Sequence, residues 1–229
     1  MQGIPSALFK RLDILKSSDF EHNIPYMYVD SVGIITIGIG HNLTRDAAYK
    51  NHIYHVARRT RKKLAGGDSG VAIGEKRNLR DKATGQEIED DFRFLSLHAG
   101  NGSGAGLWKY APENMSAYAT LEMPPIEILR LFAEDLKKHY DIARQTLGAA
   151  TFDALHLGGQ AALVDIAYNV GNISTFPTLL KVIKGEGAYG GLTATEKWRT
   201  AARHTSRPQV STVRNTKVSD WMLEGLTAK

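Results

Sequence analysis

Three polar residues near the N-terminus have types and spacing that suit acid–base chemistry. Glu21 and Asp30 are nine residues apart, and Thr36 follows Asp30 by six. Glu21 comes just after a predicted helix, whose negative dipole end disfavours a charged carboxylate and is expected to raise its pKa. Asp30 lies in a predicted polar turn, where ionisation is easier. Two carboxylates in contrasting environments can divide into an acid and a base, as in hydrolysis of a glycosidic bond.

The hydroxyl of Thr36 belongs to the segment Ile-Thr-Ile-Gly-Ile-Gly at residues 35–40. Strand alternation places Thr36, Gly38 and Gly40 on one face and the isoleucines on the other, towards the core. A hydroxyl beside two glycines is expected to face open space, where it could hold a water molecule. His41 follows directly and could support the environment of either carboxylate. Each residue alone is more often a solvated charge, a turn residue or a bulge glycine, so the prediction depends on their joint order.

A helix and a hairpin are expected to position these residues. Residues 5–20 have apolar side chains at helical spacing, which predicts a helix. Residues 26–29 and 34–39 predict two strands around a turn at 30–33. A second helix is predicted from residue 45 to about residue 64, and its end carries a basic run.

The remaining sequence divides into an irregular part and a helical part. Residues 66–119, rich in glycine, predict an irregular insertion with about one hairpin. After it, helical spacing and capping residues predict a long helix of about 24 residues ending before Gly148, followed by several shorter helices. These shorter helices are expected at about residues 152–170, from 177 to near 185, from 193 onwards and at 211–223. One hairpin and five or more helices predict an α+β protein with a large helical lobe.

Composition excludes few classes of protein. The chain has 229 residues, a net charge of +5 and no cysteine, so disulfides, thiolate metal sites and cysteine nucleophiles are excluded. The modest positive charge suits an anionic partner such as cell wall, but equally a slightly basic protein without one. No apolar run reaches the roughly 18 residues of a membrane span. Residues 1–16 lack the apolar block of a signal peptide, so another export route is expected if the protein works outside the cytoplasm.

Glu21 and the stretch PYMYVDSVGIITIGIGHNLT at residues 25–44 closely resemble the phage-type lysozymes of glycoside hydrolase family 24. The family pattern is a glutamate after the first helix, then Y-x-D-x-x-G-x-x-T-I-G-x-G-H, which is matched without a break from Tyr28 to His41. The resemblance implies a lysozyme-like α+β fold, in which a small lobe with a β-hairpin sheet is joined by a long helix to a larger all-helical lobe.

The resemblance also implies an organisation as a single lysozyme-like domain, residues 1–229. Residues 1–45 would hold the first helix and catalytic hairpin, and residues 117–148 the connecting helix. The helical lobe would be residues 149–229. Residues 46–116 have no recognised counterpart in the family and are expected to form an insertion on the small lobe.

By resemblance, the chain is expected to be a muramidase that cleaves the β-1,4 bond between N-acetylmuramic acid and N-acetylglucosamine. Protonated Glu21 would donate to the leaving oxygen, and Asp30 with Thr36 would activate or position a water molecule, which favours inversion. An arginine near the C-terminus is expected to pair with Glu21; Arg214 is the candidate, Arg207 is an alternative, and without the family a surface arginine is the simpler interpretation. The residues expected to support the site or bind substrate are Tyr28, Gly38, His41, Asn169 and Arg214.

The expected partners are bacterial peptidoglycan and an immunity or inhibitor protein, and the chain is expected to be a monomer. It would act in the periplasm or cell wall, as a phage endolysin released through a holin pore or as an effector delivered by a secretion system. No metal or cofactor is expected. His52 and His55 would share one helix face, but no compact His/Asp cluster is expected to complete a metal site, and a surface pair is the simpler interpretation.

Two other classes of function stay open from the sequence. A lysozyme fold could bind glycan without cutting it, although binding alone does not need Glu21, Asp30 and Thr36 together. The basic run at residues 58–63 could bind nucleic acid, but it lacks interleaved aromatic residues and is more typical of a solvated helix end, so no nucleic-acid partner is expected.

Overall fold

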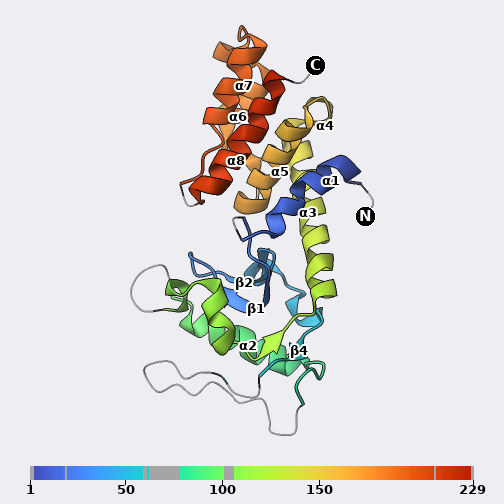
Figure 1. Cartoon of the computed structure of the whole chain (residues 1–229), viewed down its shortest axis with the longest axis vertical. Coiled ribbons are helices and arrows are strands. Elements are labelled where there is room, and N and C mark those ends of the chain that lie inside the picture. The colour runs from blue at the N-terminus through green and yellow to red at the C-terminus, as the bar shows by residue number, and fades with distance from the viewer. Residues whose placement is uncertain are drawn as a thin grey trace. The chain divides into compact units, whose positions relative to one another are not determined.

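A computed structural model describes most of the chain as two compact units. The described residues are 3–18, 20–58, 61, 78–100, 106–208 and 210–227. The helical unit comprises Met1–Phe20 and Ala133–Lys229, and the sheet unit comprises Glu21–Phe132. The division falls within the long helix α3 (Pro125–Leu147), so each unit contains part of it (Figure 1). Helices combined with a small antiparallel sheet confirm the predicted α+β class.

The predicted hairpin is present in the sheet unit. Strands β1 (Ile24–Val29), β2 (Ile35–Gly38) and β3 (His41–Asn42) form an antiparallel sheet in the order β1-β2-β3. The predicted turn joins β1 to β2, where the Gly33 amide donates to the Asp30 carbonyl at 3.1 Å and Gly33 has a φ of 88°. This positive φ explains the glycine, because other residues rarely adopt it.

The second predicted helix is wrong over the described residues between 45 and 58. This segment contains the 3₁₀ turns η2 (Leu43–Arg45) and η3 (Tyr49–Asn51) and then strand β4 (His55–Val56). Asp46 accepts a hydrogen bond from the Ala48 amide at 2.8 Å, a local side-chain bond that competes with helix formation. Strand β4 pairs instead with β5 (Leu121–Glu122). The rest of the predicted helix, except Arg61, lies outside the described residues.

The predicted irregular insertion contains a regular helix, α2 (Gly85–His98), which is a correction to the sequence analysis. Thr84 and Glu87 form a capping box, in which the Glu87 amide donates to Thr84 Oγ1 at 3.3 Å and Glu87 Oε2 accepts from the Thr84 amide at 2.6 Å. Ile88, Asp91 and Leu95 are buried at helical spacing. Two 3₁₀ turns follow, η4 (Leu107–Lys109) and η5 (Pro112–Ala117). Residues 66–77 and 101–105 of the predicted insertion lie outside the described part.

The cap of α2 gives a testable prediction. Replacing Thr84 by alanine removes the side chain that accepts from the Glu87 amide, so the free energy of unfolding should fall by about 1 kcal/mol. Urea unfolding followed by circular dichroism measures this change. Ser96→Ala is the control, because Ser96 is exposed within the same helix and alanine there should slightly favour the helix. Equal stability of wild type and Thr84→Ala would contradict the capping role.

Asp91 connects α2 to the second sheet. This fully buried carboxylate accepts from the amide of Thr120 at 3.0 Å, from the Thr120 hydroxyl at 2.6 Å and from the Leu121 amide at 3.3 Å. Arg61 Nε donates to the same carboxylate at 3.2 Å. Because a buried carboxylate needs such partners, these bonds fix α2 beside strand β5.

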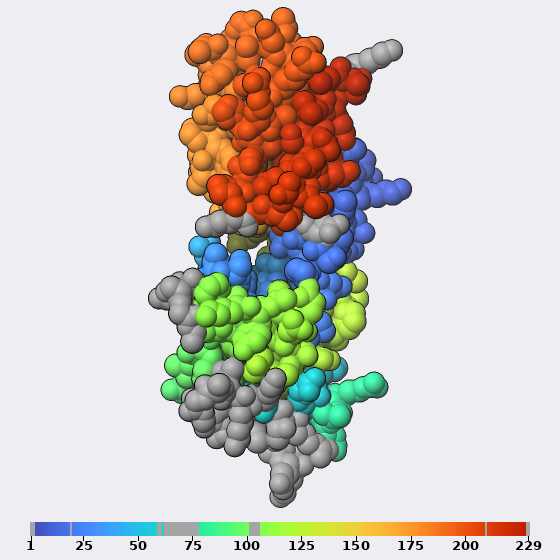
Figure 2. Space-filling view, turned by 60° about the vertical axis from the view of Figure 1, so that its left-hand side comes forward, coloured from blue at the N-terminus to red at the C-terminus, as the bar shows by residue number. Residues whose placement is uncertain are grey.

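The helical unit confirms most of the helix predictions. Its elements, with α3, are α1 (Ser6–Leu12), η1 (Asp13–Lys16), α4 (Ala149–Asp153), α5 (Leu157–Val170), η6 (Ile173–Thr175), α6 (Pro177–Lys184), η7 (Gly187–Tyr189), α7 (Ala194–Arg203), α8 (Thr212–Leu223) and η8 (Glu224–Leu226). Helix α7 packs against both α6 and α8. The residues of this part of the chain, orange to red, form a continuous surface in Figure 2. The predicted helix at 152–170 is divided at residues 154–156. The long helix, predicted as about 24 residues ending before Gly148, is confirmed at Pro125–Leu147.

Helix α5 forms the core of this unit, since ten of its residues are buried. A Cβ atom on Gly158 would lie 2.3 Å from the Trp221 carbonyl oxygen of α8. The glycine therefore permits close packing of α5 against α8. No helix in the described part of the chain has the length and apolar character needed to cross a bilayer.

Candidate active site

The Glu21 carboxylate lies against Gly40 at the end of the β1–β2 hairpin region. A Cβ atom on Gly40 would lie 2.7 Å from Glu21 Oε2 and 3.0 Å from Glu21 Cδ. Gly40 also has a φ of +70°, in the left-handed region that favours glycine. Gly40 is therefore the residue that makes room for the candidate catalytic carboxylate.

The expectation of open space beside Thr36 is wrong. Thr36 is only 5% exposed, and its hydroxyl lies 3.4 Å from the Ile34 carbonyl oxygen. The first turn of α3 covers Gly38, because a Cβ atom there would lie 3.0 Å from Ile128 Cγ2. The space beside Gly38 is filled by Ile128, and the space beside Gly40 is filled by Glu21. Any water held by Thr36 must therefore occupy a confined position.

The hydroxyl of Tyr28 is affected by the charges of both candidate carboxylates. Its side chain is buried in β1, and Tyr28 pairs with Thr36 across the hairpin. Burial raises the pKa of the Tyr28 hydroxyl, and the negative charges of Glu21 and Asp30 raise it further. The pKa of Tyr28 therefore responds to both Glu21 and Asp30, and Thr36 is its partner across the hairpin.

Asp30 anchors the turn between β1 and β2. Its Oδ1 atom accepts from the amides of Val32 at 2.9 Å and Ile34 at 2.8 Å. These bonds fix the orientation of the carboxylate, which is half-buried. Asp30 thus has a structural role in the turn, and its fixed orientation also suits a residue that directs a water molecule.

The helix-dipole argument for Glu21 fails. Helix α1 ends at Leu12, and the 3₁₀ turn η1 ends at Lys16, so the first helix is shorter than the predicted 5–20. Ser17 is extended, with a ψ of 155°, which ends the turn well before Glu21. A helix dipole acts mainly within the last turn, and therefore no longer accounts for a protonated Glu21.

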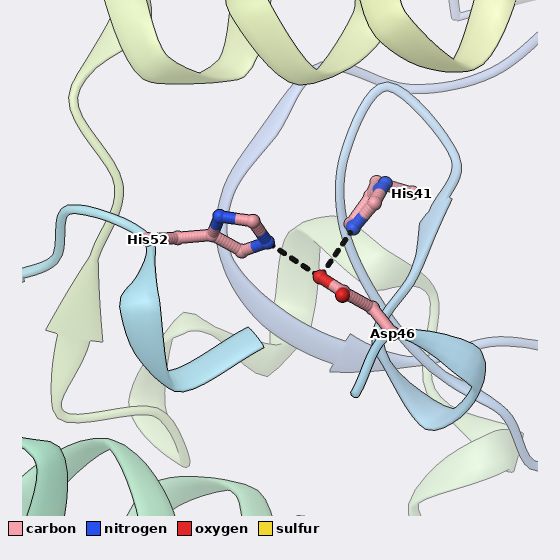
Figure 3. Close-up of side chains that lie close together, drawn as sticks. All are labelled: His41, Asp46 and His52. Atoms are coloured by element: carbon pink, nitrogen blue, oxygen red, sulfur yellow. Dashed lines mark hydrogen bonds and ion pairs between the residues drawn. The ribbon is translucent and has the colours of Figure 1, made fainter. Parts of the chain in front are cut away.

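A cluster of two histidines and an aspartate lies beside the hairpin (Figure 3). Asp46 Oδ2 lies 3.2 Å from His41 Nε2 and 2.5 Å from His52 Nε2. Both rings point towards this carboxylate, and one potential ligand atom from each residue lies within 4.8 Å of the others. We name this group the His41–Asp46–His52 cluster. Burial opposes ionisation of Asp46, but hydrogen bonds from His52, the Ala48 amide and His41 outweigh it and lower the Asp46 pKa.

The cluster corrects two expectations from the sequence. A compact His/Asp group does exist, and His52 and His55 do not share a helix face, because His55 belongs to strand β4. The available signal was an aspartate flanked by two histidines within twelve residues. The predicted helix from residue 45 concealed this signal, because the segment that contains Asp46 and His52 was expected to be helical.

Two residues of α3 extend this cluster. Arg130 Nη2 lies 3.2 Å from His52 Nδ1, and Glu127 Oε1 lies 3.7 Å from the same nitrogen. Glu127 also accepts from Arg130 Nε at 2.9 Å and from the Ile53 amide at 3.2 Å. The hydrogen bond from Arg130 lowers the pKa of Glu127 against the opposing effect of burial. Sequence reasoning singled out neither Glu127 nor Arg130.

The two candidate arginines converge on a buried aspartate in the helical unit. Arg214 Nε donates to Asp165 Oδ1 at 2.9 Å, and Arg207 Nη2 lies 2.8 Å from Asp165 Oδ2. Both arginines are buried, so the surface-arginine alternative is wrong. Arg214 Nη1 also donates at 3.2 Å to the carbonyl of Phe20, the residue before Glu21. The pairing of Arg214 with Glu21 stays a prediction.

Asn169 lies near the C-terminal end of α5 and is exposed. Its expected role in supporting the site or binding substrate stays a prediction. No protein-family model and no curated protein matches this sequence, so the interpretation of the site depends on its geometry and on the motif that carries it.

Proposed function

We propose that the chain is a muramidase with a lysozyme-like arrangement of its α+β fold. It would hydrolyse the β-1,4 bond between N-acetylmuramic acid and N-acetylglucosamine in bacterial peptidoglycan. The observation that carries this proposal is the position of the Glu21 carboxylate against Gly40, the last glycine of the T-I-G-x-G-H segment. A general acid needs such a fixed position, and the same hairpin supplies Asp30 and Thr36.

The mechanism divides the work between two carboxyl groups. Protonated Glu21 donates its proton to the glycosidic oxygen as the bond to the anomeric carbon breaks. Ionised Asp30 accepts a proton from a water molecule that Thr36 helps to position, and the water oxygen bonds to the anomeric carbon. Attack from the opposite face inverts this centre. Neither step requires a metal or an organic cofactor.

Burial of Tyr28 supports this division of roles. Burial and the nearby acidic groups raise the pKa of Tyr28, so it stays neutral and adds no charge that would compete with either carboxyl group. The fixed turn around Asp30 supports its role as the base, because the orientation of the carboxylate is set before substrate binds.

The proposed setting is the periplasm or cell wall of bacteria. There the chain would act as a bacteriolytic endolysin or as an antibacterial effector, and an immunity or inhibitor protein would be its protein partner. The alternative is a protein that binds peptidoglycan without cutting it.

Product analysis of digested cell walls tests the proposal. The full chain is incubated with purified, outer-membrane-stripped walls, turbidity is followed, and the soluble fragments are reduced and identified by mass spectrometry. We expect clearing with new reducing ends at N-acetylmuramic acid. Reducing ends at N-acetylglucosamine, 1,6-anhydro ends or cleaved peptides would each contradict the proposal. Wall binding without clearing would favour the binding alternative.

Thr36→Val tests the role of the hydroxyl. Valine keeps the β-branched shape in a buried strand position, so the free energy of unfolding should change by less than about 1 kcal/mol. Loss of a hydrogen bond to the attacking water should lower the rate of wall clearing about fivefold, since one such bond contributes about 1 kcal/mol. Turbidity and urea unfolding measure the two effects. An unchanged rate would reject a role for Thr36 in holding water.

A further inference from the structure

The His41–Asp46–His52 cluster has the donor set of a transition-metal site. It offers two imidazole nitrogens and one carboxylate oxygen, which are common ligands of Zn²⁺. Ca²⁺ and Mg²⁺ prefer oxygen ligands throughout, so two nitrogens select against them. Three protein ligands leave one position of a tetrahedral zinc site for a water molecule.

The geometry permits a single ion to reach all three ligands. The three atoms lie within 4.8 Å of one another, and both rings point towards Asp46 Oδ2 (Figure 3). Zn²⁺ binds at about 2.0–2.2 Å from nitrogen and oxygen ligands, so adjustments of side-chain torsions within this spread are sufficient. The side chains are 10–18% exposed, which leaves a route for the ion from solvent.

Glu127 provides the outer carboxylate that zinc-bound histidines commonly have. Arg130 Nη2 lies 3.2 Å from His52 Nδ1, which accepts because a guanidinium can only donate, so His52 Nε2 carries the proton directed at Asp46. Metal binding to Nε2 would place the proton on Nδ1 instead. That proton could then be donated to Glu127 Oε1, now 3.7 Å away, with Arg130 retaining Glu127 as its partner.

We propose that this cluster binds one Zn²⁺ ion through His41 Nε2, Asp46 Oδ2 and His52 Nε2, with water as the fourth ligand. The ion connects strand β3 to the segment that contains η2 and η3. It would stabilise the sheet unit directly after Gly40, the residue that accommodates Glu21. This inference goes beyond the proposed function, because zinc binding is measured without any assay of activity.

Metal titration of the full, tag-free chain tests the proposal. After treatment with EDTA and its removal, the protein is titrated with ZnCl₂ by calorimetry, and with CoCl₂ by visible absorption. We expect one Zn²⁺ ion per chain, the intense d–d absorption of tetrahedral Co²⁺, and an increase of about 5–10 °C in the unfolding midpoint at a hundredfold excess of zinc over the dissociation constant. CaCl₂ and MgCl₂ should give no midpoint increase.

Variants assign the ion to the cluster. Asp46→Asn keeps an oxygen that can accept from the Ala48 amide, so the fold should survive, and His52→Gln removes a ligand from a different segment. Each should weaken zinc binding at least tenfold. His204→Gln is the control, because His204 is exposed in the helical unit, and its zinc affinity should equal that of wild type.

Two outcomes would overturn the proposal. The first is wild-type protein that binds less than one Zn²⁺ ion per chain at about 100 micromolar metal, a concentration that should fill a specific site. The three residues would then form only an ion-pair cluster. Zinc binding that is equal in wild type, Asp46→Asn and His52→Gln would place the ion elsewhere. Circular dichroism of both variants distinguishes a lost ligand from a lost fold.

Discussion

Glu21→Gln is expected to lower the rate of wall clearing by about a thousandfold or more. Glutamine keeps the size of the side chain and therefore its contact with Gly40, but its amide cannot donate the proton that the leaving oxygen needs. Positioned general acids typically contribute 10²–10⁴-fold, and poor leaving groups depend on them most. Initial rates of turbidity loss, together with counts of new reducing ends, measure the effect.

Glu122→Gln is the matched control for this experiment. Glu122 is an exposed residue of strand β5 in the same unit, so its replacement makes the same change in charge and size. Its clearing rate should equal that of wild type. Both variants should unfold at nearly the wild-type temperature, because neither substitution removes apolar packing. Wild-type activity in Glu21→Gln would exclude Glu21 as the general acid.

The hairpin could be predicted because its sequence signals are local. Alternation between Ile35 and Gly40 marks the strand, and an aspartate three residues before a glycine marks the turn. The structure contains this turn with Gly33 at positive φ, as such a turn requires. Helices α6, α7 and α8 were predictable for the same reason, since Pro177, Thr193 and Ser211 mark their starts.

The segment after the hairpin could not be predicted from periodicity. Asp46 bonds its own local backbone, and His55 pairs with a strand more than sixty residues later, so tertiary contacts override helical spacing there. The His41–Asp46–His52 cluster could not be predicted for the same reason. By contrast, α2 had a readable signal, because Thr84 and Glu87 have capping-box spacing and Ile88 and Leu95 repeat helically.

The surroundings of the candidate site could not be predicted from the sequence. The motif predicts that Glu21, Asp30 and Thr36 act together, and all three belong to the sheet unit, but it could not show what fills the space beside Gly38 and Gly40. Ile128 and Glu21 fill it, and both approach from segments outside the hairpin. Similarly, the burial of Arg207 and Arg214 depends on Asp165 in α5, about forty residues earlier. Pairings between residues so far apart in the sequence become visible only in the folded structure.

Gly40→Ala is expected to lower the rate of wall clearing about a hundredfold without removing any reacting group. The new Cβ atom would lie 2.7 Å from Glu21 Oε2, a distance at which the carboxylate must move. A displacement of about 1 Å of a catalytic group can cost a hundredfold in rate. Alanine at a φ of +70° also costs about 1–2 kcal/mol of folding free energy, so urea unfolding is measured beside the rate.

Gly187→Ala separates these two effects. Gly187 has a similar φ of +60°, but nothing lies within 4 Å of the position of its Cβ atom. Its replacement should therefore cost a similar free energy of unfolding and leave the clearing rate unchanged. If both variants lose stability equally and both clear walls at the wild-type rate, Gly40 does not position the acid. If only Gly40→Ala loses activity, the contact between Gly40 and Glu21, rather than backbone strain, is what catalysis requires.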